Sequence, residues 1–326
     1  MSVKSTEIVK KAFFLSAILL ALLSCKADYE SAGTGYEFAI IPQPAYMKLK
    51  TGSFTLRKST VIYCKSNDLQ SYFVKRLEKI LEAKGKKLIG WDEILEGGLA
   101  PNAAVMSWRG MEGGVAAAKA NHHVVMSPSD YAYLDLYQGD PAIEPRTYGM
   151  VRLNKVYSFE PVPDGVDSTF ILGGQGNLWS EGVPTFRHAE YMLWPRAFAL
   201  SEVFWSPKQS RDWDGFVRRM ETHLQRLSQA DINYSRSVYD AIITPVKDEK
   251  ENLLIQLSTE IEGFEIYYSF DDTYPDNHSS SYKKGEKLVI PKNADTFRVI
   301  TYRDGKAIGR IITISVADLA KRYNEY

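Results

Sequence analysis

Two adjacent carboxylates, Asp92 and Glu93, follow Trp91 within the stretch LIGWDEILEGG, residues 88–98. An acidic pair at the end of a buried strand is suited to acid and base chemistry, such as cleavage of the bond between two sugars. The pair fits a polar strand end at the start of a helix equally well. Adjacent side chains of a strand point to opposite faces, so Trp91 and Asp92 face the same way only where the strand has ended.

A second acidic cluster lies in the stretch DDTYPDN, residues 271–277. Its oxygen-bearing side chains are Asp271, Asp272, Asp276 and Asn277. Such side chains are calcium ligands, but their spacing matches no calcium-binding loop. We interpret the segment as a turn between two strands. The sequence therefore predicts no metal site and no cofactor.

The first 25 residues have the form of a bacterial lipoprotein signal peptide. Lysines precede the apolar run AFFLSAILLALL, residues 12–23, which is shorter than the roughly 20 residues needed to span a bilayer. The next residues, Ser24 and Cys25, complete a lipobox-like end, so we expect lipidation of Cys25; a plain signal peptide is the alternative. The expected location is the bacterial cell envelope, in the periplasm or on the outer membrane surface, with the lipid as the only membrane anchor. Cys64 is the one other cysteine, which leaves no internal disulfide.

The composition excludes one class of partner. Lys and Arg together number 40, as do Asp and Glu, so the formal net charge is zero. A neutral chain gives no electrostatic reason to expect nucleic acid as a partner. The aromatic content of 12% suits stacking on carbohydrate, but it suits an ordinary core as well.

The elements that would position these residues alternate between strand and helix from residue 66 to about residue 235. The predicted strands are 86–91, 103–108, 122–128 and 168–179, and the predicted helices are 66–84, 111–120, 186–204 and 214–230, with a long loop over 131–167. Pro195 is expected to kink the third helix or to lie near its start. Alternation of this kind predicts a parallel sheet, here of about four strands. An eight-stranded barrel takes about 250 residues, so the segment is either a small open sheet or half of a barrel.

The chain becomes all-β after this segment. Residues 236–326 carry short alternating strands separated by polar turns, which predict a small antiparallel β-sandwich. The predicted strands are 252–259, 264–270, 286–291, 295–303 and 309–315. Ahead of residue 66, residues 26–37 are typical of a polar tether and residues 38–65 are strand-like.

Several motifs, in order along the chain, resemble glycoside hydrolase family 20, the β-N-acetylhexosaminidases. The motifs are IGWDEILEGG (89–98), VMSWRG (105–110), YLD (133–135), GGQGNLWSE (173–181) and EYMLWPRAFALSEVFW (190–205). The resemblance implies that residues 38–65 are a remnant of the family's N-terminal α/β domain. It further implies that residues 66–235 are the C-terminal half of a (β/α)8 TIM-type barrel, with a β-sandwich module after it.

The resemblance also implies a substrate-assisted retaining mechanism, in which the 2-acetamido oxygen of the sugar attacks its own anomeric carbon. An Asp of the family orients the acetamido group and a Glu protonates the leaving oxygen. By resemblance, Trp91, Trp108 and Trp179 are aromatic walls around the acetamido group, Tyr133 is its hydrogen-bond partner, and Asp135 and Glu181 hold outer sugar hydroxyls. Tyr131 and Tyr137 are left open as site residues, and His188, Glu190 and Arg196 are interpreted as structural.

The chain departs from the family at its catalytic centre. The family motif His-x-Gly-Gly-Asp-Glu is absent, since none of the five histidines precedes an Asp-Glu pair. Asp92 and Glu93 correspond to a position one strand later, so no catalytic residue is assigned. The strand-like segment 38–65 runs directly into the helix at residue 66, as expected after an internal deletion. Half a barrel has two open sheet edges, which favour self-association.

Two functional classes follow from these observations. The first is a β-N-acetylhexosaminidase by descent, acting on glycans with terminal N-acetylglucosamine or N-acetylgalactosamine, with little or no activity left. The second is a noncatalytic lipoprotein that binds glycan or another partner. A third hypothesis, in which Asp92 and Glu93 replace the missing catalytic pair, has the least support.

Overall fold

The computed structural model describes residues 66–325, which belong to one compact unit, Tyr63–Tyr326. The predictions that lie outside the described residues concern the signal peptide (1–25), the tether (26–37), the segment 38–65, Cys25 and Cys64. Lipidation and envelope location therefore stay predictions from the sequence. None of the helices between residues 66 and 325 is long and apolar enough to cross a membrane.

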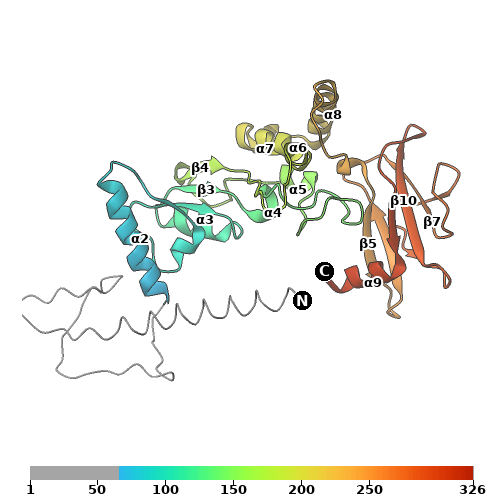
Figure 1. Ribbon diagram of the computed structural model, residues 1–326, viewed down its shortest axis with the longest axis horizontal. Helices are drawn as coiled ribbons and strands as arrows, with labels where there is room; N and C mark the ends of the chain where they lie inside the picture. The colour runs from blue at the N-terminus through green and yellow to red at the C-terminus, as the bar shows by residue number, and fades with distance from the viewer. Residues whose placement is uncertain (1–65, 326) are drawn as a thin grey trace, which may run out of the picture. The chain divides into compact units, whose positions relative to one another are not determined.

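Four short strands form one parallel sheet in the order β1-β2-β3-β4 (Figure 1). They are β1 (Ile89–Trp91), β2 (Ala104–Ser107), β3 (Val124–Met126) and β4 (Ile171–Gly174). Ile89 pairs with Ala104, and Val105 pairs with Val124, in parallel register. The predicted parallel sheet is confirmed, and its strands are shorter than the apolar runs because several residues of each run form turns. All four carboxyl ends meet at one edge of the sheet, where the residues that follow each strand can come together.

Helix α3 (Glu112–Lys119) connects β2 to β3, and it carries two buried alanines, Ala117 and Ala118. Gly114 lets the helix approach the sheet, because a Cβ there would collide with the sulfur of Met126. Helix α2 (Ser66–Glu82) precedes β1 and packs through Val74 against Ala100 and Ala103. Its opposite side is exposed and apolar, with Leu69, Phe73, Leu77 and Ile80. Within the part of the chain that the structure describes, β1 and β4 each pair with only one strand.

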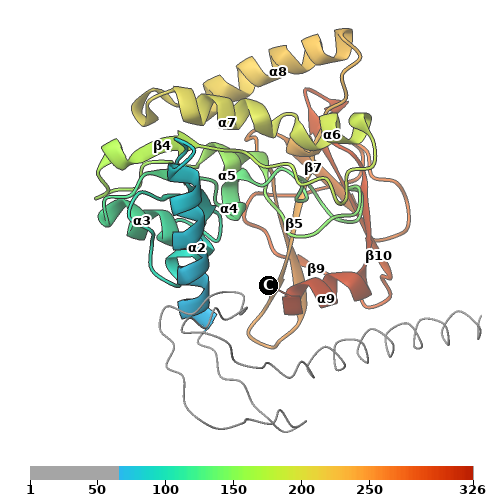
Figure 2. The ribbon, with the colours of Figure 1, turned by 60° about the vertical axis from the view of Figure 1, so that its left-hand side comes forward.

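The predicted helix over 186–204 is two helices, α6 (Phe186–Leu193) and α7 (Arg196–Trp205). The break lies at Trp194, whose ψ of 136° is extended, just before Pro195. The single-helix prediction is wrong, because Pro195 divides the predicted helix and directly precedes the first residue of α7. Helix α8 (Trp213–Gln229) follows, begins with the Asp212 side chain accepting from Gly215 N–H at 2.7 Å, and lies along α7 on the side away from β4 (Figure 2).

The segment predicted as a loop over 131–167 contains a further helix, α5 (Leu153–Tyr157), and follows a short helix, α4 (Ser129–Ala132). Leu153, Val156 and Tyr157 of α5 are buried in the core shared with α7 and α8. A helix of five residues is too short to give a periodic pattern in the sequence, so the loop prediction missed it.

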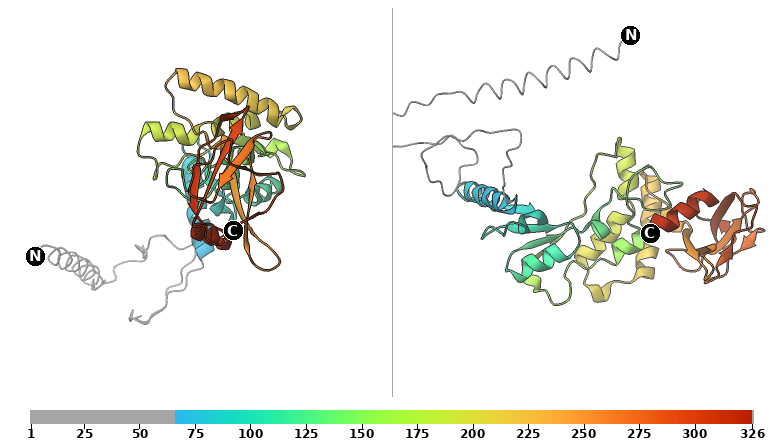
Figure 3. Two further views of the ribbon diagram at one scale, coloured as in Figure 1. Left: turned by 90° about the vertical axis from the view of Figure 1, so that its right-hand side faces the viewer. Right: turned by 90° about the horizontal axis from the view of Figure 1, so that it is seen from below.

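The C-terminal part consists of two antiparallel sheets. One contains β5 (Ile242–Lys247), β6 (Leu253–Ser258) and β9 (Leu288–Val289); the other contains β7 (Glu265–Ser269), β8 (Ser280–Ser281), β10 (Thr296–Arg303), β11 (Lys306–Ala307) and β12 (Ile312–Ser315). Strand β5 was not predicted, and its Pro245 is tolerated because β5 pairs only with β6. Helix α9 (Val316–Glu325), also not predicted, packs beside these strands (Figure 3).

Charged side chains connect the C-terminal part to the residues around the parallel sheet. Arg310 donates to Glu144 at 2.5 Å and to Asp240 at 2.6 Å, and both carboxylates are almost fully buried. Arg322 of α9 donates two hydrogen bonds to Asp140. Buried ion pairs of this kind are costly to break, because removal of one partner leaves the other uncompensated.

Candidate functional site

Four aromatic side chains come together at the carboxyl edge of the parallel sheet. The ring centroids of Trp91 and Trp179 are 5.9 Å apart, and those of Tyr133 and Trp179 are 6.2 Å apart. Trp108 stacks on Tyr133 with centroids 6.3 Å apart and an interplanar angle of 17°. Each ring comes from the end of a different strand or from the segment after it, so the structure unites all three predicted tryptophans with the predicted tyrosine.

Backbone hydrogen bonds bring Tyr133 beside Trp179. Leu134 N–H donates to the Asn177 carbonyl at 2.7 Å, and Asn177 N–H donates to the Ala132 carbonyl at 2.8 Å. The segments after β3 and β4 are thereby paired beyond the last strand residues. Burial raises the pKa of Tyr133, and the nearby Trp179 and Asn177 side chains oppose that rise.

Asp92 accepts hydrogen bonds from the turn that carries Trp108. Its Oδ2 accepts from the backbone N–H groups of Trp108 and Arg109, each at 3.1 Å, and its Oδ1 accepts from Arg109 Nε at 2.7 Å. The side chain is only 2% exposed. Asp92 also begins the 3-10 helix η1 (Asp92–Leu95), as the strand-end interpretation predicts.

Glu93 is directed at the same tryptophan. Its Oε1 accepts a hydrogen bond from the indole N–H of Trp108 at 3.0 Å, and its backbone carbonyl accepts from Gln70 Nε2 at 2.7 Å. Its Oε2 is buried and has no hydrogen-bond partner. The two carboxylates that the sequence offers as an acid and base pair are thus both engaged with Trp108 and its neighbour.

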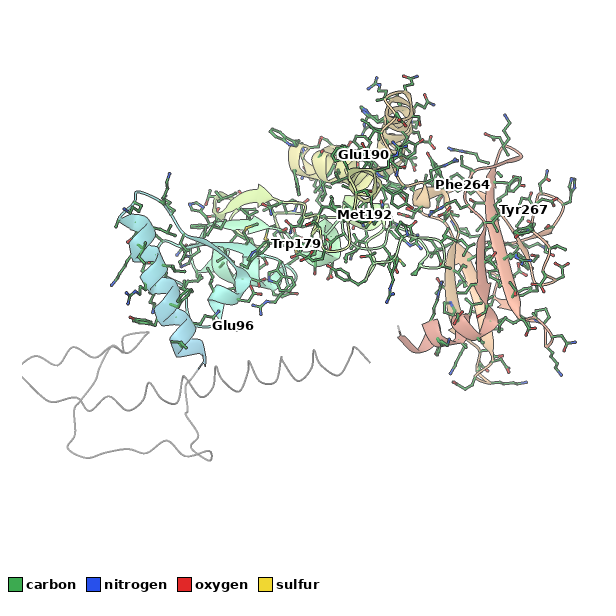
Figure 4. The ribbon with its side chains drawn as sticks, viewed as in Figure 1. Glu96, Trp179, Glu190, Met192, Phe264 and Tyr267 are labelled. Carbon is green, nitrogen blue, oxygen red and sulfur yellow. The ribbon has the colours of Figure 1, made fainter. Side chains whose placement is uncertain are left out.

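A cavity of about 250 Å³ lies next to the aromatic cluster, and Trp179, which is labelled in Figure 4, belongs to both. Its lining consists of Asp135, Arg146, Thr147, Tyr148, Trp179, Glu181, Gly182, Val183, His188 and Met192. The structure therefore places both predicted carboxylates, Asp135 and Glu181, in one cavity. Trp91 and Trp108 do not line it.

Asp135 lines this cavity and has one carboxylate oxygen without a hydrogen-bond donor. The residue is 5% exposed, its Oδ2 accepts from the hydroxyl of Tyr148, and its Oδ1 is buried with no hydrogen-bond partner. A buried carboxylate oxygen without a donor carries a desolvation cost that a ligand hydroxyl would relieve. Burial and the adjacent Asp135 both raise the pKa of the Tyr148 hydroxyl, which keeps it protonated as a donor.

Tyr148, Arg146 and His188 line the cavity and were not predicted as site residues. Tyr148 and Arg146 lie in a segment without regular pattern, 13 and 11 positions after Asp135 by their numbers. The only sequence signal for residues 146–148 is that they follow the YLD motif, residues 133–135, by a short distance. His188, interpreted as structural, has a buried Nε2 with no hydrogen-bond partner.

Arg196 binds the backbone of the YLD segment through the Leu134 carbonyl. It is fully buried and donates to the carbonyls of Leu134 at 2.5 Å, Val151 at 2.9 Å and Met192 at 2.9 Å. Burial lowers the pKa of Arg196 to about 9. A planar guanidinium with five donors suits three carbonyls from different segments, which agrees with the structural role expected for this residue.

The remaining candidates lie elsewhere. Tyr131 stacks on Phe159 with centroids 5.2 Å apart, and Tyr137 contributes backbone hydrogen bonds to Gly149 and Val151. Neither lines the cavity. Glu190 accepts from the Asn233 N–H at 3.0 Å. Across residues 66–325 no group of three or more His, Cys, Asp or Glu side chains is arranged to hold a metal ion.

Comparison with known proteins identifies the family of this site. The sequence model described as "Glycosyl hydrolase family 20, catalytic domain" matches residues 53–208, and one described as "Fn3 associated" matches residues 255–316. A β-hexosaminidase of Porphyromonas gingivalis is 48% identical over 173 residues, which are 52% of this chain and 22% of that protein. A β-N-acetylhexosaminidase of Cellulomonas fimi is 35% identical over 151 residues, 44% of this chain and 30% of that protein.

The solved structure of the family 20 exo-β-N-acetylglucosaminidase of Vibrio harveyi with N-acetylglucosamine is 31% identical, covers 53% of this chain and 28% of that chain, and has a TM-score of 0.49. The matched region thus spans less than a third of the length of each of these three proteins. The family match covers all the motifs around the four aromatic rings and the cavity. Residues 53–208 are therefore similar to the catalytic domain of glycoside hydrolase family 20.

Proposed function

We propose that this chain binds the terminal N-acetylhexosamine of a glycan and hydrolyses it slowly or not at all. The observation that carries the proposal is the shared position of Trp179, whose ring contacts Trp91 and Tyr133 and also lines the cavity of Asp135 and Glu181. Apolar rings beside polar acceptors fit an amino sugar, which has an acetamido methyl group and several hydroxyl groups.

The proposed roles follow the chemistry of each side chain. Trp91, Trp108 and Trp179 form walls for the acetamido group, and the Tyr133 hydroxyl donates to its oxygen. In the adjacent cavity, the free Oδ1 of Asp135 accepts from an outer sugar hydroxyl, since carboxylates are strong acceptors. Glu181 lines the same cavity and supplies a second acceptor.

Weak or absent hydrolysis follows from the missing His-x-Gly-Gly-Asp-Glu motif. Substrate-assisted hydrolysis needs an acid at the leaving oxygen and a carboxylate that orients the acetamido group. Asp92 already accepts three hydrogen bonds from Trp108 and Arg109, and Glu93 accepts the Trp108 indole N–H. These contacts argue against the two residues as substitute catalysts.

Binding is tested by titrating the protein with N-acetylglucosamine, with glucose as the control that lacks the acetamido group. We expect saturable binding of the first sugar and binding at least about tenfold weaker for the second, because the acetamido group supplies the contact with the rings. Equal affinity for the two sugars would remove the role assigned to the aromatic walls.

Hydrolysis is tested with a chromogenic N-acetyl-β-glucosaminide. We expect no release of the chromophore above the rate of a heat-denatured sample. Turnover at the rate of an ordinary hexosaminidase, abolished by Glu93→Gln, would contradict the noncatalytic assignment.

We further propose that β1–β4 are half of a (β/α)8 barrel and that the two C-terminal sheets are a β-sandwich. The parallel order of the four strands and the placement of the site at their carboxyl edge support the first proposal. The exposed apolar side of α2, together with the outer strands β1 and β4, favours self-association. Sedimentation velocity would detect it as a rise in mass with concentration, and a constant monomer mass would exclude it.

A further inference from the structure

We propose that Glu93 is a positioning residue, which fixes the Trp108 ring as a wall of the sugar site. The inference rests on the proposed function, because it assigns a task within the same site. It concerns the acidic pair of the GWDE motif, which the proposed chemistry leaves without a role.

Trp108 needs an external support to hold one orientation. It follows the last residue of β2, Ser107, and precedes α3, so it lies in a turn and is only partly buried. Its one ring contact within the aromatic cluster is the stack on Tyr133. An indole in such a position has several side-chain rotamers unless its N–H group is engaged.

Asp92 and Glu93 supply that support, one to the backbone of Trp108 and the other to its ring. Asp92 fixes the backbone, because its Oδ2 accepts from the N–H groups of Trp108 and Arg109. Glu93 fixes the ring, because its Oε1 accepts from the indole N–H at 3.0 Å.

Glu93 itself is held in place from the other side. Its backbone carbonyl accepts from Gln70 Nε2 of α2 at 2.7 Å, and η1 begins directly after β1. The orientation of Trp108 therefore depends on residues from η1 and α2. Hydrogen bonds therefore connect Gln70 of α2 through Glu93 to Trp108 in the aromatic cluster.

The indole N–H bond to Glu93 also determines what Trp108 offers to a ligand. With its only polar group engaged, the side chain presents an apolar face and no donor. An apolar face suits the methyl group of an acetamido substituent, whereas a free indole N–H would also donate a hydrogen bond to a sugar hydroxyl. Glu93 thereby contributes to selectivity for the N-acetylated sugar without touching it.

Three substitutions of Glu93 and one matched control test the assignment. Glu93→Ala removes the acceptor, Glu93→Asp withdraws it by one methylene, and Glu93→Gln keeps an acceptor oxygen at the indole. Glu96→Ala is the control, because Glu96 (Figure 4) lies at the end of the same 3-10 helix, is exposed, and pairs with Arg109 Nη1 at 2.6 Å without contacting Trp108.

The first readout is the indole N–H resonance of Trp108 in ¹⁵N-labelled protein, assigned through its loss in Trp108→Phe. We expect Glu93→Ala and Glu93→Asp to shift this resonance and to speed its hydrogen exchange by about tenfold or more, with the indole resonances of the other five tryptophans in place. Glu93→Gln and Glu96→Ala should leave it within about threefold of the wild-type exchange rate. An unchanged Trp108 resonance in Glu93→Ala would overturn the proposal.

The second readout is the affinity for N-acetylglucosamine. We expect a loss of about tenfold in Glu93→Ala and Glu93→Asp, which corresponds to about 1.4 kcal/mol, and affinity within about threefold of wild type in Glu93→Gln. A Glu93→Gln variant as weak as Glu93→Ala would mean that the negative charge itself is required, which contradicts a positioning role. If the wild type binds no N-acetylglucosamine, the proposed function fails, while the indole resonance still decides whether Glu93 fixes the ring.

Discussion

Trp179 is the central side chain of the proposed site, because it contacts two aromatic rings and lines the cavity. It is 39% exposed, so part of its ring is available to a ligand. A large apolar ring that is left partly open on a folded surface is a frequent mark of a binding site. The neighbouring Asp135, with a buried oxygen that has no donor, supplies the polar counterpart.

Replacement of Trp179 by Ala is expected to weaken binding of N-acetylglucosamine by at least about thirtyfold, or about 2 kcal/mol, because a central aromatic contact is lost. The measurement is isothermal titration calorimetry on both proteins. Trp205→Ala is the matched control, since Trp205 is 88% exposed, ends α7 and does not line the cavity. Equal losses in the two variants would show that the effect does not come from the site.

At the scale of the elements, the position of α7 decides where the YLD segment lies. Arg196, the first residue of α7, donates to carbonyls of three segments that are far apart in the sequence. The break at Pro195 directs the start of α7 toward these carbonyls. A continuous helix over 186–204 would place Arg196 within a regular helix interior instead.

Arg196→Met is expected to reduce the free energy of unfolding by at least about 3 kcal/mol, because three carbonyls lose a buried donor and each unpaired group costs about 1–3 kcal/mol. Urea denaturation followed by circular dichroism measures this change. Arg187→Met is the control, since that side chain is 55% exposed and its ion pairs are weak surface contacts. A loss below about 1 kcal/mol for Arg196→Met would contradict the role assigned to the guanidinium.

At the scale of the whole molecule, Glu260 connects the C-terminal part to α5. Its Oε2 accepts from Asn154 N–H at 2.8 Å, and Arg152 lies 3.7 Å from its Oε1. Burial raises the pKa of Glu260 to about 7, against the opposing effects of Arg152 and Arg196. The carboxyl group thus resists ionisation in the folded state.

Stability is expected to fall between about pH 4.5 and pH 7 on account of Glu260. Below this window the carboxyl group is protonated in both states, while within it the unfolded chain ionises first and the folded state loses relative stability. Above pH 7 the free energy of unfolding falls no further on account of Glu260. The total loss is about 1.4 kcal/mol for each unit by which the pKa in the folded state exceeds the pKa in the unfolded state. We therefore expect Glu260→Gln to gain about 3 kcal/mol relative to wild type between pH 4.5 and pH 8.

Urea titrations of both proteins at a series of pH values measure this difference. Glu262→Gln serves as the control, because Glu262 is 85% exposed and pairs only with the equally exposed Lys284 among the described contacts. A constant difference between Glu260→Gln and wild type across the window would show that Glu260 does not ionise at a raised pH.

The sequence by itself determined the alternation of strand and helix, the parallel sheet, the resemblance to glycoside hydrolase family 20 and the six candidate residues that the structure brings to the aromatic cluster and the cavity. These depend on local patterns: apolar runs, helical periodicity and motifs that occur in order along the chain. It also determined the absence of the family's catalytic motif, since that requires only reading the residues.

Only the tertiary structure decided what those residues do together. It assigned Asp92 and Glu93 to Trp108, 16 and 15 positions away, and it brought Tyr148 and His188 to the cavity of Asp135. It also divided one predicted helix at Trp194 and added α5, β5 and α9. Contacts between distant residues depend on the order and direction of the strands that carry them, and no local pattern records that order.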